Sequence, residues 1–153
     1  MFCDITVFLG NNKKTIKAFI DTGNLLKDPI SGMPVIVIES IQLEKLIPKK
    51  IIYHLNDILE GKDDNILSQI ANEDMLKFRI IPFSSLGKQN GLLLGFIADK
   101  LEIKLEENTT DLSNVIIGIY DKSLTKNGAY TGLVGIDIIE RCGKYEYFTS
   151  IKK

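Results

Sequence analysis

Hydrophobic and polar residues alternate along several short stretches of this chain, which is the pattern of half-buried β-strands. Two of these stretches are separated by Gly10-Asn11-Asn12, a strong signal for a tight hairpin turn. Continuous apolar runs at residues 34–39 and 114–118 predict more fully buried strands. The strands predicted in this way span residues 3–9, 15–20, 34–39, 78–83, 92–97, 101–105, 114–118 and 145–151. The pattern therefore predicts a mainly β protein.

The pattern changes to near-helical spacing between residues 40 and 77. Ser40 is a candidate N-cap for a short helix that Pro48 ends, and residues 64–76 predict a second helix. We interpret the segment as a helical insertion, which either borders a binding site or serves only packing. Near the C-terminus, residues 136–141 predict a further helix, and residues 108–111 predict a loop.

Length and composition indicate one globular domain over residues 1–153. The formal net charge of −1 gives no general attraction to nucleic acid or anionic membranes. The single histidine, His54, and the cysteines Cys3 and Cys142 do not have metal-ligand spacing, so we expect no metal and reduced thiols. No apolar run approaches the roughly 20 residues that cross a bilayer, and the chain is therefore expected to be soluble.

The candidate chemistry lies at the end of the second predicted strand. Asp21 follows the apolar pair Phe19-Ile20 directly, which places a carboxylate at the edge of the core. Thr22 supplies a hydroxyl that can fix a turn, and Gly23 allows close approach of another backbone. A carboxylate held on a rigid turn is what an acid protease needs, since two such groups share one proton and activate water.

This stretch carries a resemblance to a known family. Asp21-Thr22-Gly23 is similar to the active-site signature of aspartic proteases, and the longer run over residues 20–37 resembles the sigma-E factor processing peptidases of endospore-forming bacteria. The resemblance implies a retropepsin-like closed β-barrel with a helical insertion at about 40–77, one lobe per chain. It also implies catalysis by Asp21 with no cofactor, with Thr22 and Gly23 forming the active-site loop and Asn24 binding substrate.

The chain contains one such triplet, whereas an aspartic protease site needs two carboxylates. A two-lobed protease would need a chain about twice as long. We therefore expect a homodimer that places one Asp21 from each subunit across a two-fold axis. A non-catalytic dimer of the same fold, used for binding, is the alternative, as is an unrelated β-rich adaptor with a turn at this position. Asp28, which precedes a proline, is interpreted as a turn residue rather than a second catalytic acid.

Two further elements complete the predicted site. The hairpin over residues 78–97 has the glycines that a mobile flap requires, with an ordinary surface hairpin as the alternative. The resemblance implies that Ser85, Gly87 and Gly91 of this hairpin bind substrate. The family also places a hydrophobic-hydrophobic-Gly strand behind the acid. We favour Ile116-Ile117-Gly118 for this strand, with residues 133–135 as a competing match. The arginine that often follows in the family is replaced here by Ile119 and Tyr120.

The resemblance also implies a biological setting. The substrate would be the precursor of a sporulation sigma factor, pro-sigma-E, which is cleaved near its amino terminus. The family joins this domain to a membrane domain of its own at the sporulation septum, so the domain would face the cytoplasm. An activating signalling protein is implied as a partner, and nucleic acid is not.

Overall fold

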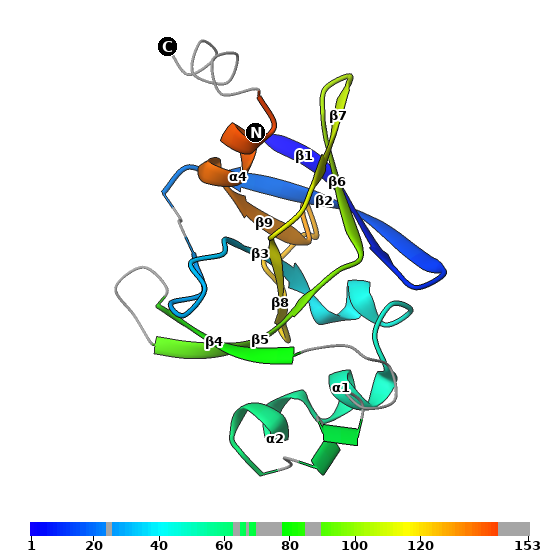
Figure 1. The fold of residues 1–153 in the computed structure, drawn as a ribbon, viewed down its shortest axis with the longest axis vertical. Helices are drawn as coiled ribbons and strands as arrows, with labels where there is room; N and C mark the ends of the chain where they lie inside the picture. Colours follow the sequence, from blue (N-terminus) through cyan, green and yellow to red (C-terminus); the bar gives the residue numbers. More distant parts are fainter. Residues whose placement is uncertain (24–25, 63–64, 67, 70–77, 85–89, 144–153) are drawn as a thin grey trace.

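Nine strands form one twisted sheet, and short helices cover parts of it (Figure 1). The computed structural model describes residues 1–23, 26–62, 65–66, 68–69, 78–84 and 90–143. The strand order is β4-β5-β8-β3-β9-β2-β1-β6-β7. In chain order the elements are β1 (Phe2–Leu9), β2 (Asn12–Asp21), β3 (Val35–Glu39), η1 (Ser40–Leu43), α1 (Lys49–Tyr53), α2 (Leu55–Leu59), β4 (Phe78–Ser84), β5 (Asn90–Ile97), β6 (Lys100–Leu105), β7 (Asn108–Leu112), β8 (Ile116–Tyr120), β9 (Gly132–Gly135) and α4 (Ile136–Arg141).

The predicted tight turn joins β1 to β2. Leu9 pairs with Asn12, and Gly10 has a φ of 59°, a left-handed conformation that a side chain would disfavour. The predicted loop at residues 108–111 is wrong, because this stretch forms β7 and pairs with β6. Its polar residues resemble a loop because none of the side chains of β7 is fully buried.

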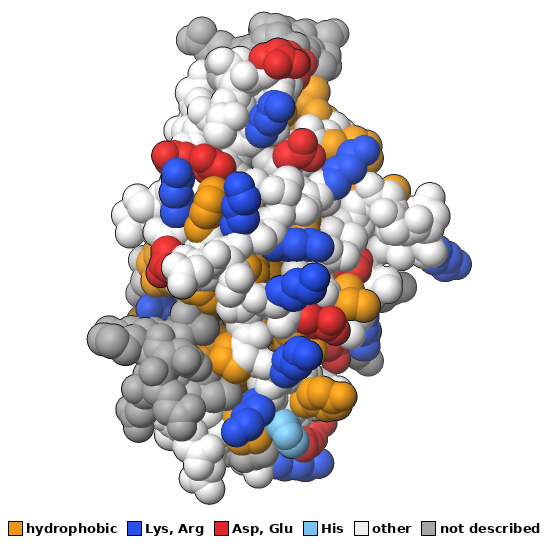
Figure 2. Space-filling model, turned by 90° about the vertical axis from the view of Figure 1, so that its right-hand side faces the viewer, with side chains coloured by type: hydrophobic (Ala, Val, Ile, Leu, Met, Phe, Trp, Pro, Cys, Tyr) orange, Lys and Arg blue, Asp and Glu red, His pale blue; other side chains and the backbone are white. Residues whose placement is uncertain are grey.

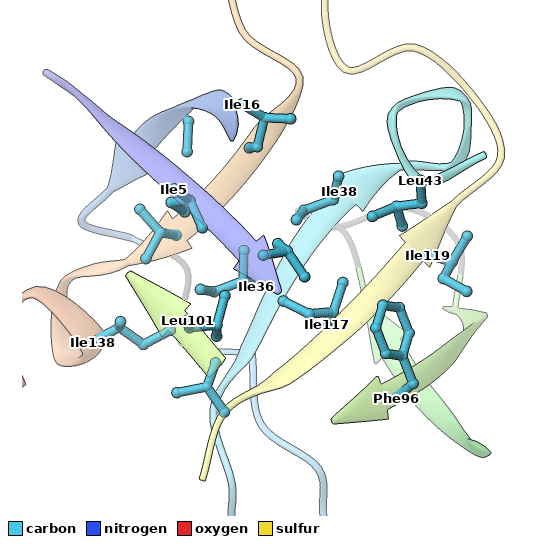
Figure 3. Close-up of a cluster of buried hydrophobic side chains, with 14 of the residues drawn as sticks. Ile5, Ile16, Ile36, Ile38, Leu43, Phe96, Leu101, Ile117, Ile119 and Ile138 are labelled. Atoms are coloured by element: carbon cyan, nitrogen blue, oxygen red, sulfur yellow. The ribbon is translucent and has the colours of Figure 1, made fainter. Parts of the chain in front are cut away.

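Strands β3 and β8 lie in the middle of the sheet and pair in parallel. Both faces of β3 are buried: Ile36 and Ile38 point into the main core, and Val35 and Val37 into a second apolar cluster. Figure 3 shows side chains from β1, β3, β6 and β8 meeting in the main core. Burial on two faces explains why the sequence here is a continuous apolar run rather than an alternating one.

The second apolar cluster consists of Val35, Val37, Ile81, Leu93 and Ile116, and it is called here the hairpin cluster. Two of its members come from β4 and β5, so it joins this hairpin to the centre of the sheet. The partly buried side chains packed against it are Leu26, Met33, Phe83, Tyr120, Leu124 and Leu133.

The segment between β3 and β4 contains η1, α1 and α2. Its apolar side chains are buried in the same core as Phe96 of β5, which favours the packing interpretation of this segment. These side chains are Leu43, Leu46, Ile47, Ile51, Leu55 and Ile58. Ser40 is not a helix N-cap, because it lies inside the 3-10 helix η1. Most of the predicted helix over 64–76 falls outside the described residues.

The sheet is open, so the expectation of a closed barrel is wrong, while the mainly β class is confirmed. Closure would require hydrogen bonds between the two edge strands, which are β4 and β7. Within the described residues β7 pairs only with β6, and Leu112 is its one hydrophobic side chain packed against the core. The edge strand predicted at 145–151 lies outside the described residues.

Candidate active site

Asp21 is the last residue of β2, where a buried strand reaches the end of the sheet. Ala18 and Ile20 point into the core and are 0% and 3% exposed. Because side chains alternate along a strand, Asp21 points to the opposite face and is half-buried. The strand thus fixes the backbone of Asp21 while its carboxylate stays accessible.

A local hydrogen bond fixes the orientation of this carboxylate. The backbone N–H of Gly23 donates to Oδ1 of Asp21 at 2.9 Å, forming an Asx turn. Among the described residues, a Cβ at position 23 would lie within 4 Å only of Asp21 Oδ1, at 3.6 Å. Thr22 is exposed on the same turn, and Asn24 lies outside the described residues. The turn therefore presents a half-buried carboxylate with one of its oxygens bound to a backbone donor.

Strand β9 lies beside the acid. It pairs in parallel with β2, and Asp21 is opposite Gly135. The strand behind the acid is therefore Leu133–Gly135 and not Ile116-Ile117-Gly118, which belongs to β8 and pairs with β3 and β5. Both stretches end in glycine after two apolar residues, so the local pattern did not distinguish them.

Close packing explains the glycine at the start of β9. A Cβ on Gly132 would lie 2.5 Å from Cδ1 of Ile16 and 3.3 Å from the carbonyl oxygen of Val37. Gly132 therefore allows β9 to fit between β2 and β3. A similar constraint explains the glycine of β8, because a Cβ on Gly118 would lie 3.0 Å from Cγ1 of Val35. Gly118 thus serves packing of the hairpin cluster.

The predicted flap is a hairpin in the structure, formed by β4 and β5 in antiparallel register from Phe78↔Phe96 to Ser84↔Asn90. Ser85 and Gly87 fall in its tip, at residues 85–89, outside the described residues. Gly91 is described: a Cβ there would lie 2.6 Å from the ring of Phe83. Because Gly91 has no side chain, the ring of Phe83 has room to pack there. A contact of Gly91 with substrate stays a prediction.

Asp28 is a turn residue, as predicted, but it is also buried, with only 3% exposed. Its carboxylate accepts hydrogen bonds from Ser31 Oγ at 2.7 Å, the N–H of Ile30 at 3.2 Å and Arg79 Nη1 at 3.1 Å. The Ser31 bond, with those from Ile30 and Arg79, lowers the pKa of Asp28 although burial opposes this. Arg79 was missed by the sequence reasoning. The only local signal for it is a charge inside an otherwise apolar strand.

Thiols and charged side chains elsewhere form no second site in the described part of the chain. Cys3 and Cys142 are free and buried, and burial raises the pKa of Cys3 to about 12, which makes it a poor nucleophile. Among the described residues no three His, Cys, Asp or Glu side chains gather as metal ligands would. Figure 2 shows basic, acidic and hydrophobic side chains interspersed over one face. Lys100, for example, lies 3.4 Å from Glu102 and 3.6 Å from Asp111.

Comparison with known proteins adds the decisive observation. The family model described as sporulation factor SpoIIGA, a peptidase family, matches residues 1–138. The chain belongs to this family.

Individual relatives agree with the family assignment. The chain is 26% identical over 131 residues to the sporulation sigma-E factor-processing peptidase of Priestia megaterium, covering 86% of this chain and 42% of that protein. It is 28% identical over 131 residues to the protein of that name in Bacillus subtilis, and the match covers 82% of this chain and 40% of that protein. A putative sporulation sigma factor-processing peptidase of Bacillus thuringiensis is 26% identical over 133 residues, and the match covers 85% of this chain and 79% of that protein.

The match covers only part of the length of two of these relatives. The chain spans about two fifths of the Priestia megaterium and Bacillus subtilis proteins. No solved structure matches significantly. None of the described helices of this SpoIIGA-family chain has the length and apolar character to cross a membrane.

Proposed function

We propose that this chain is an aspartic endopeptidase domain that works as a homodimer and processes the precursor of a sporulation sigma factor. The observation that carries the proposal is the Asp21 turn, in which a half-buried carboxylate at the end of β2 is oriented by the N–H of Gly23. The family name of peptidase and the names of the relatives support proteolysis of a sigma-E factor precursor.

The second carboxylate of the site comes from a second chain. Asp28, the other acid near the turn, is buried and already accepts bonds from Ser31, Ile30 and Arg79. These bonds hold the Asp28 carboxylate inside its own turn, and it stays ionised because its pKa is lowered. A two-fold axis next to the exposed Thr22 brings two copies of Asp21 together.

The proposed mechanism needs only this carboxyl pair and water. The ionised Asp21 takes a proton from water as the oxygen attacks the peptide carbonyl, and the protonated Asp21 of the other subunit donates its proton to the carbonyl oxygen. The tetrahedral intermediate then breaks its C–N bond as the amine nitrogen is protonated. Backbone groups of the β4–β5 hairpin hold the substrate strand over the acids.

The experiment is cleavage of a sigma-E factor precursor by wild type and by Asp21→Asn, in the protein as it occurs in the cell and with equal folded amounts. Asparagine keeps the shape and the bond from Gly23 but removes the shared proton, so cleavage should fall at least 1000-fold with little loss of stability. Asp111→Asn, at an exposed carboxylate on β7, is the matched control and should retain full activity.

The alternative function, a non-catalytic binding module, predicts the opposite pattern. In that case Asp21→Asn would leave precursor binding and precursor processing unchanged. Residual cleavage within tenfold of wild type would also exclude Asp21 as the catalytic acid.

A further inference from the structure

The turn that follows the acid is linked to the flap hairpin by a partly buried ion pair. Nη1 of Arg79, on β4, lies 3.1 Å from Oδ2 of Asp28. The side chain of Asp28 is 4% exposed and that of Arg79 is 35% exposed. The two residues are 51 positions apart, so no local turn requires this contact.

The turn itself is complete without Arg79. The N–H of Asp28 donates to the carbonyl oxygen of Met33 at 2.9 Å, and the N–H of Gly32 donates to that of Asp28 at 2.8 Å. Ser31 Oγ and the N–H of Ile30 bind the Asp28 carboxylate from within the turn. These bonds suffice to close a tight turn, so the bond to Arg79 adds a connection to another element.

Arg79 is placed at the root of the flap hairpin. It is the second residue of β4 and is opposite Gly95, while the tip lies beyond Ser84. At about 3.3 Å per residue, the five steps from Arg79 to Ser84 make an arm of roughly 17 Å. The bond to Asp28 therefore fixes the position from which this arm extends.

The turn held by Asp28 is itself tied to β3, one of the central strands of the sheet. The N–H of Val35 donates to the carbonyl oxygen of Leu26, and Lys27 pairs with Pro34, so the turn is anchored where β3 begins. Leu26 and Met33 pack against the hairpin cluster together with Phe83 of β4. The segment after the acid and the flap thus share one apolar cluster and one charged contact.

We propose that Asp28 and Arg79 are positioning residues that fix the root of the β4–β5 hairpin against the turn that follows Asp21, and thereby control the binding of the substrate strand. This inference rests on the proposed protease function. In this role neither residue needs to touch reacting atoms, because the Asp28 carboxylate is buried and the Arg79 guanidinium is bound to it. Arginine suits the role since its planar guanidinium gives a directed, permanently charged donor.

The test separates KM from kcat. Arg79→Gln removes the charge and frees the root of the hairpin, so KM for a sigma-E factor precursor should rise about tenfold while kcat changes less than threefold. Arg79→Lys keeps a cation near Asp28 and should recover most of the increase. Glu60→Gln is the matched control, because it breaks the exposed Lys62–Glu60 pair away from the hairpin and should change neither constant.

A second measurement does not depend on activity. Hydrogen exchange at the amides of β4 and β5 should accelerate at least tenfold in Arg79→Gln and Asp28→Asn, relative to amides of β1 and β2 in the same protein. Faster exchange in all strands alike would mean a merely structural pair and would overturn the proposal, as would unchanged KM in Arg79→Gln. If the wild type cleaves no precursor while β4–β5 exchange still responds selectively, the protease function fails and the link between the turn and the hairpin stands.

Discussion

Gly132 controls how closely the strand beside the acid approaches its neighbours, and Gly132→Ala tests this directly. The added Cβ would lie 2.5 Å from Cδ1 of Ile16 and 3.3 Å from the carbonyl oxygen of Val37. Ile16 is 4% exposed and packed in the core, so its methyl group has little room to move. The φ of Gly132 lies outside the left-handed region, and the cost therefore comes from packing alone.

The size of the effect follows from overpacking, which typically costs 1–3 kcal/mol. We expect Gly132→Ala to lower the free energy of unfolding by about 2 kcal/mol and the Tm by about 4–8 °C for a chain of this length. Ile16→Val removes the clashing methyl and alone costs about 1 kcal/mol. In the double variant the alanine fits, so the total loss should be about 1 kcal/mol rather than the additive value of about 3 kcal/mol.

Urea unfolding of the four proteins measures this cycle. Ile51→Val is the matched control, since it deletes a methyl from the same core but from α1, which is not a neighbour of β9 in the sheet. Combined with Gly132→Ala, it should be additive within about 0.5 kcal/mol. Additivity in the Ile16 cycle as well would refute the reasoning, because it would show that Ile16 does not limit the approach of β9.

Two other predictions concern pH and assembly. Because the folded pKa of Asp28 is lowered, its contribution to stability is fully present above the ordinary aspartate pKa of about 3.9 and is lost as the pH falls through the folded value. The difference in unfolding free energy between wild type and Asp28→Asn, from urea titrations at pH 7 to 3, should therefore shrink below about pH 4; a constant difference would contradict this. The isolated chain is expected to be a weak dimer of low activity, so that specific activity rises with protein concentration in parallel with the dimer fraction from sedimentation equilibrium; a tight, fully active dimer would contradict this.

Local patterns predicted the elements well where burial alone sets the sequence. Alternating polarity, the position of glycines and burial on two faces are each visible in the local sequence. They were enough to predict the turn at Gly10, the β4–β5 hairpin and the apolar strands β3 and β8. The choice between Gly118 and Gly135 was not predictable in this way. Both follow two apolar residues, and only the pairing of β9 with β2 across the sheet places Gly135 opposite Asp21.

The other differences have the same origin. Asn108–Leu112 carries residues typical of loops, yet backbone pairing with β6 makes it a strand whose side chains stay in solvent. Closure of the sheet depends on whether two edges meet, which no single stretch encodes. The ion pair of Asp28 joins it to Arg79, 51 residues away, so the sequence predicted its turn but not its contact with the hairpin.

The pairing of Asp21 with Gly135 has a consequence for the timing of synthesis. The two residues are separated by 135 − 21 = 114 positions, and β9 is the last strand described along the chain. At about 5–20 residues per second, the ribosome needs roughly 6 to 23 seconds after Asp21 to produce its neighbour. Throughout that interval the nascent chain carries the acid without the strand that supports it. The surroundings of Asp21 are therefore incomplete until β9 has been synthesised.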